Sequence, residues 1–155
     1  MIGDVVLQKR SGIVGWFVSL FTKSEYVHVG IDVGEDVIVH VDWRGKRTAT
    51  YEEWADGLLV LSFKHALTYK QRVDLIETIM KESVKGYSFW NAVMSWWRKD
   101  PDDDKPTGTY NQCAEFVCRC YRKIGIDLVP QRSDDTTQPQ DFLESPFLNL
   151  KALKT

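Results

Sequence analysis

The residues best suited to chemistry are a cysteine near a predicted helix start and two histidines far upstream of it. Cys113 follows Asn111 and Gln112, and the apolar residues after it recur at helical spacing. Asn111 is a favourable N-cap, and the free N–H groups and positive dipole end of a helix start stabilise a thiolate. We therefore expect a lowered thiol pKa at Cys113 and a nucleophile able to attack a carbonyl carbon.

A base for this thiol must come from the histidines, and two of the three lie in strand-like segments. Residues 25–33 and 37–43 flank the turn sequence Gly34-Glu35-Asp36, which predicts an antiparallel hairpin. Alternation places His28 on the face opposite the valine row, and residues whose numbers sum to about 68 then lie opposite each other. His28 would thus face His40, as a base beside the group that orients it. Each is also compatible with an ordinary half-buried strand histidine.

Composition predicts a single globular domain over residues 1–155. The chain is 43% hydrophobic and 27% charged with a net charge of -2, and it has no basic stripe, so nucleic acid is not an expected partner. The longest apolar run, residues 13–21, is too short for a transmembrane segment. No Sec signal peptide is recognisable. We expect a cytoplasmic protein, a virion-associated one, or one exported by a non-Sec route, and the oligomeric state stays open.

The remaining segments supply the scaffold. Cys113, Cys118 and Cys120 fall in one predicted helix and are too far apart along it to form a disulfide, so the last two are expected to pack within the core. A capping box at Thr68 and Gln71 predicts a long helix. Further expected elements are strands at 5–7, 47–49, 58–63 and 147–150, helices at 11–21 and 87–97, a helical turn at 50–54, a short helix from Pro139, and a surface loop at 99–108 as a candidate flap.

The order of these motifs resembles a known superfamily. Gly3-Asp4-Val5-Val6-Leu7, Tyr26-Val27-His28-Val29-Gly30-Ile31, His40 and then Asn111-Gln112-Cys113-Ala114-Glu115-Phe116-Val117 is similar to the circularly permuted branch of the NlpC-type papain-like thiol hydrolases. That branch includes YiiX-like proteins and the lecithin:retinol acyltransferase family. The resemblance implies an α+β papain-like fold whose antiparallel sheet carries the histidines and packs against the cysteine helix. YiiX-like proteins usually have a glutamate at the position of His40, whereas a second histidine resembles the acyltransferases.

The resemblance also implies a mechanism. Cys113 is the expected nucleophile, His28 the general base and His40 the residue that orients it, with no cofactor. Gln112 or Tyr26 is expected to assist the Cys113 N–H in an oxyanion hole. The expected activity is that of a cysteine peptidase or amidase acting through a thioester on peptide or amide bonds, including bacterial cell-wall (peptidoglycan) stem peptides.

Two other functions remain open from the sequence. A lipid acyltransferase or phospholipase would use the same three residues. A non-catalytic domain could bind zinc through Cys113, His28 and His40, although these lack the short paired spacing of structural zinc sites.

Overall fold

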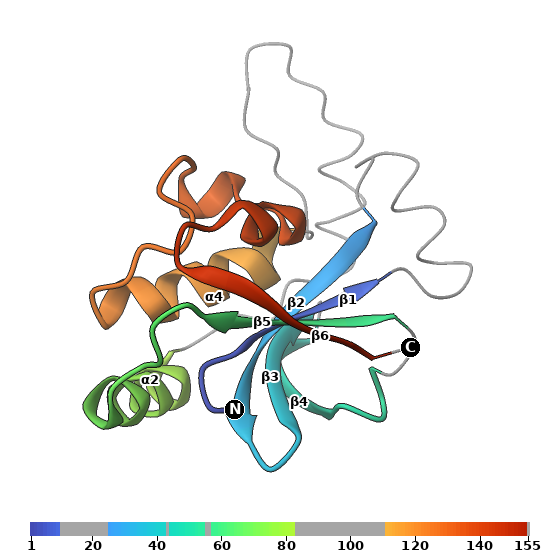
Figure 1. The fold of residues 1–155 in the computed structure, drawn as a ribbon, viewed down its shortest axis with the longest axis horizontal. Coiled ribbons are helices and arrows are strands. Elements are labelled where there is room, and N and C mark those ends of the chain that lie inside the picture. The colour runs from blue at the N-terminus through green and yellow to red at the C-terminus, as the bar shows by residue number, and fades with distance from the viewer. Residues whose placement is uncertain (10–24, 43, 55–56, 83–110, 155) are drawn as a thin grey trace.

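The computed structural model describes residues 1–9, 25–42, 44–54, 57–82 and 111–154, and its centre is a six-stranded antiparallel sheet (Figure 1). The strand order is β4-β3-β2-β1-β5-β6, so the hairpin that carries the histidines lies beside the N-terminal strand. The predicted α+β class is correct. The strands are β1 (Val5–Lys9), β2 (Tyr26–Gly34), β3 (Val37–Asp42), β4 (Gly45–Thr50), β5 (Leu58–Phe63) and β6 (Leu148–Lys154).

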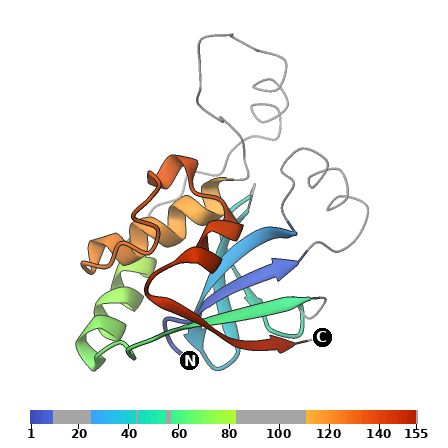
Figure 2. The ribbon, with the colours of Figure 1, turned by 45° about the horizontal axis from the view of Figure 1, so that its top comes forward.

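The helices gather on one side of this sheet (Figure 2). They are α2 (Tyr69–Lys81), α4 (Asn111–Lys123) and the short 3-10 helices η1 (Asp134–Thr136) and η2 (Pro139–Glu144). The predictions for residues 11–21, 87–97 and 99–108 lie outside the described residues. Within the part of the chain that the structure describes, no helix has the length and apolar character needed to cross a membrane.

Alternation along the strands divides the core into two clusters, one on each face of the sheet. The first joins Val29, Ile31 and Val39 to the buried face of α4, including Cys113. The second, which we call the Trp54 cluster, contains the buried residues Val6, Ile38, Ala49, Trp54, Leu58 and Val60. Val29, Ile31 and Val33 of β2 therefore face the helices, whereas His28 contacts Trp54 on the other face.

The α2 helix begins with the predicted capping box, in which Thr68 and Gln71 bond reciprocally. Leu75 and Ile79 are buried, whereas Tyr69 and Met80 are exposed, because α2 lies at the margin of the helical layer and packs against α4 with one face only.

The hairpin forms as predicted, with a shifted register. Glu35 and Asp36 both have positive φ, 52° and 58°, which is the backbone of a two-residue type I′ turn. This turn is tighter than the predicted three-residue one, and β2 carries an irregularity next to it. His40 therefore pairs with Gly30 instead of His28.

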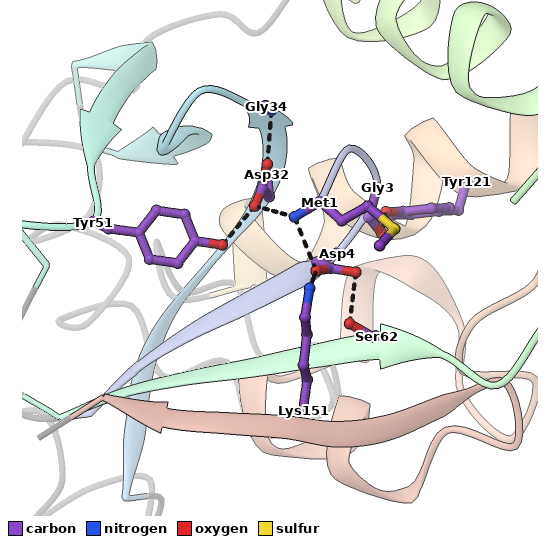
Figure 3. Close-up of polar contacts among 9 residues, drawn as sticks. All are labelled: Met1, Gly3, Asp4, Asp32, Gly34, Tyr51, Ser62, Tyr121 and Lys151. Atoms are coloured by element: carbon purple, nitrogen blue, oxygen red, sulfur yellow. Dashed lines mark hydrogen bonds and ion pairs between the residues drawn. The ribbon is translucent and has the colours of Figure 1, made fainter. Parts of the chain in front are cut away.

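Two buried aspartates join the start of β1 to the strands around it (Figure 3). Asp32 accepts hydrogen bonds from the Met1 ammonium at 2.8 Å and the Tyr51 hydroxyl at 2.6 Å. Asp4 accepts from the same ammonium at 3.1 Å and from Lys151 of β6 at 2.7 Å. Each buried carboxylate thus has a positively charged partner, which offsets the cost of removing it from water.

Candidate active site

His28 and His40 form a direct contact, which we call the imidazole pair. His28 Nε2 and His40 Nδ1 are 2.7 Å apart, and the two rings are nearly perpendicular, at 80°. The shifted register does not separate them, because the diagonal neighbour of a cross-strand position remains within reach of a ring. Trp54 lies against both rings, with centroid separations of 5.2 Å to His28 and 5.1 Å to His40.

Both imidazoles are neutral in this environment at pH 7. Burial and the neighbouring His40 together lower the pKa of His28 to about 3, although the Asp42 carboxylate acts in the opposite direction. Burial also lowers the pKa of His40, again against Asp42. A neutral imidazole has one nitrogen that donates and one that accepts, so the contact between the rings assigns a proton to one of the two facing nitrogens.

The strands that carry the pair diverge next to it. The pairing between β2 and β3 extends to Gly30 and His40, whereas β2 continues along β1 as far as Tyr26. The amide of Asp32 donates to the carbonyl of Asp4, immediately before β1, at 2.9 Å. Because amide directions alternate in an antiparallel strand, the Val29 N–H points to the β3 side, into the space where the strands separate. We call this space the strand opening.

The thiol of Cys113 lies at the strand opening. Its sulfur receives a hydrogen bond from the Val29 N–H, in the position that a β3 carbonyl would occupy if the ladder continued. The N–H groups of Cys113 itself and of Ala114 also interact with it. The nucleophile predicted from the sequence therefore contacts the β2 backbone at the residue immediately after His28.

The predicted lowering of the Cys113 pKa is wrong. The thiol is 3% exposed, and burial raises its pKa to about 11, although the N–H groups of Val29, Ala114 and Cys113 act in the opposite direction. The helix does begin at Asn111, as predicted, but the Asn111 side chain lies outside the described residues. A sequence pattern locates a helix start without showing how deeply that start is buried.

The two residues predicted to assist an oxyanion hole differ in their surroundings. Gln112 has a buried Oε1 atom with no hydrogen-bond partner among the described residues, so it presents an acceptor there. Tyr26 is half-buried at the start of β2 and packs against the helix-side cluster. Cys113, Cys118 and Cys120 are all free and buried, which confirms the absence of an internal disulfide.

Sequence reasoning missed two contributors. Trp54 was predicted only as part of a helical turn, and no sequence spacing connects it to the histidines. The Val29 N–H could not be predicted either, because its availability depends on where β2 and β3 separate.

The two facing nitrogens of the imidazole pair do not fit a shared zinc ion. Zinc–nitrogen bonds of 2.0–2.1 Å to both facing nitrogens, at their separation of 2.7 Å, would force an angle of about 80° at the metal, well below tetrahedral. Among the residues that the structure describes, no three histidine, cysteine, aspartate or glutamate side chains are grouped to hold a metal ion.

The chain is similar to known proteins in its fold. No protein-family model matches the chain, and no curated protein matches it. Among solved structures, the chain is similar to the crystal structure of the metalloprotein YiiX from Escherichia coli O157:H7, with a TM-score of 0.67 and 17% identity. The match covers 99% of this chain and 97% of the other. The chain therefore shares the fold of YiiX over nearly its whole length.

Proposed function

We propose that this protein is a cysteine hydrolase of the permuted NlpC-type, papain-like class that cleaves peptide or amide bonds, with Cys113 as nucleophile. The observation that carries the proposal is the position of the thiol. It lies in a cradle of backbone N–H groups, beside the residue that follows His28, while His28 is hydrogen-bonded to His40.

One of the two possible proton arrangements of the imidazole pair would make His28 a general base. If His40 Nδ1 is the acceptor of the contact between the rings, His28 carries its proton on Nε2. The Nδ1 atom of His28 is then unprotonated and able to take a proton from the thiol. His40 fixes the tautomer and the orientation of the base, as the third residue of a catalytic triad does.

The reaction proceeds through a thioester. As His28 Nδ1 takes the thiol proton, the Cys113 sulfur bonds to the substrate carbonyl carbon, and the carbonyl oxygen becomes an oxyanion. The Cys113 N–H is the first candidate donor to this oxyanion. Collapse breaks the carbon–nitrogen bond, and the leaving amine receives the proton held by His28. Water, deprotonated by the same imidazole, then releases the acid and restores the thiol.

At rest the thiol of Cys113 and the imidazole of His28 are both neutral. With a thiol pKa near 11 and a His28 pKa near 3, proton transfer before substrate binds is unfavourable. Proton transfer to His28 and attack of the sulfur on the substrate carbonyl are then coupled. The backbone N–H groups stabilise the developing negative charge mainly while the sulfur–carbon bond forms. Interactions of this kind lower the barrier more than they tighten substrate binding.

The class of substrate follows from the resemblance of the motifs, which are similar to those of hydrolases acting on peptide and amide bonds, including bacterial cell-wall stem peptides. The fold shared with YiiX is compatible with this choice. The same thioester mechanism would also cleave ester bonds, so an experiment must distinguish peptide or amide substrates from lipid esters.

The test is to trap the acyl-enzyme. The protein is incubated with peptide amides, stem-peptide fragments and acyl esters, quenched in acid, and analysed by peptide mapping. We expect an acyl adduct on Cys113, formed from the peptide amides, that is absent in Cys113→Ala and retained in Cys118→Ala, whose cysteine is buried in the same helix. Turnover that persists in Cys113→Ala would contradict the proposal, and adducts formed from the esters alone would overturn the substrate assignment.

A further inference from the structure

Trp54 is the aromatic side chain that links the imidazole pair to the sheet core. It is 5% exposed, and its backbone N–H donates to Thr50 at 3.3 Å, which fixes it in the turn that follows β4. Its indole ring is inclined at 51° to the His28 ring and at 62° to the His40 ring. Both imidazole centroids lie within the range of about 6 Å over which a cation is attracted to an aromatic face.

We propose that Trp54 is a positioning residue whose indole stabilises the imidazolium that forms when His28 takes the Cys113 proton, an inference that rests on the function proposed above. The proton moves from the sulfur to Nδ1 of His28, so one positive charge appears in the pair and one negative charge on the thiolate. The indole is uncharged and contributes little to the neutral resting pair. Its quadrupole acts once the charge forms.

This contribution is needed because the pair is largely removed from water. Burial is the largest cause of the lowered pKa of both His28 and His40. The charged groups that act on the pair are Asp42 and Glu53, which favour protonation, and Arg44 and Arg47, which oppose it. Arg44 and Arg47 are exposed, so solvent screens their effect. Trp54 is in ring contact with both imidazoles and is itself buried, so its effect is screened least.

The first test is titration of the imidazole pair by NMR in the parent protein, Trp54→Phe and Trp54→Leu. Because the two rings interact directly, the upper apparent pKa of the pair is the quantity compared. Loss of the indole face should lower it by roughly 0.4 to 1.5 pH units in Trp54→Leu, with a smaller fall in Trp54→Phe. If Trp54 only excluded water, its loss would admit solvent and raise this pKa. A rise or no change in Trp54→Leu would overturn the proposal.

A second test preserves the shape of the core. Fluorinated tryptophans introduced at position 54 alone weaken the negative face of the indole with little change in volume. The upper pKa should then fall stepwise with the number of fluorine atoms, and an unchanged pKa would overturn the proposal even if Trp54→Leu fails to fold. Val60→Ala is the matched control, because Val60 is buried in the same cluster and has no aromatic ring. It should lower stability and leave the titration unchanged.

These titrations need no substrate. If the upper pKa falls on fluorination but the protein has no hydrolase activity, the effect of Trp54 on protonation stands and the proposed function is wrong. If the protein is an active hydrolase but the upper pKa does not change on fluorination, only the role proposed for Trp54 is wrong.

Discussion

Lowering the pH from 7 to 4 should weaken the fold through His28. Burial and the neighbouring His40 hold the folded pKa of His28 at about 3, against an ordinary value of 6.5. Below pH 6.5 the unfolded chain therefore binds a proton that the folded protein does not. The stability contributed by neutral His28 is fully present above pH 6.5 and is lost as the pH falls towards 3.

The magnitude follows from the linkage relation. A difference of one bound proton costs about 1.36 kcal/mol per pH unit, so the interval from pH 6 to pH 4 costs at most about 2.7 kcal/mol. His28 retains some contact with solvent, which reduces this figure, and we expect roughly 2 kcal/mol.

Urea unfolding at pH 7, 6, 5 and 4 measures this effect in the parent protein and in His28→Gln. Carboxylates titrate in the same range, so the difference between the two proteins isolates His28. The variant should be less stable at pH 7 and should lose less stability on acidification. His65→Gln, which alters an exposed histidine, should follow the parent. Equal pH slopes for the parent and His28→Gln would refute the buried, neutral state of His28.

Two other substitutions test the surroundings of the site. In Gly30→Ala the new Cβ would lie 2.5 Å from a methyl carbon of Ile38, so we expect a loss of about 1–3 kcal/mol in urea unfolding and, in NMR spectra, separation of the imidazole pair. Unchanged histidine signals would contradict that packing. In Asp32→Asn the buried partner of the Met1 ammonium loses its charge, and we expect a loss of about 3 kcal/mol, compared with under 1 kcal/mol for the exposed Asp74→Asn. Similar losses in the two aspartate variants would show that the buried cluster contributes no more than a surface ion pair.

Local patterns predicted the elements that carry the site. The hairpin, the start of α4 and the capping box of α2 each depend on a few consecutive residues, and the structure has all three. The register was wrong by two residues because Glu35 and Asp36 adopt positive φ, which non-glycine side chains seldom do. Only some of the apolar residues of α2 are buried, because burial depends on what packs against a helix and not on its periodicity.

The site itself was only partly predictable. Strand alternation put His28 and His40 on one face, and the rings meet there despite the register error. The protonation states were not predictable, since burial of the thiol outweighs the helix start and depends on the whole fold. The contacts of Trp54 and the N–H of Val29 with the site likewise arise from tertiary structure.

The rate of Cys113 alkylation is the most direct test of whether this thiol is an activated nucleophile. Iodoacetamide modification of each cysteine is followed by peptide mapping between pH 5 and 9, in the parent protein and in His28→Gln. Cys118 and Cys120 serve as internal references, because both are buried and burial raises the pKa of each to about 12. We predict that Cys113 reacts faster than either reference at pH 7. His28→Gln should lower the alkylation rate of Cys113 at least about tenfold. A Cys113 rate equal to the references, or one unaffected by His28→Gln, would contradict the assignment of Cys113 and His28 as nucleophile and base.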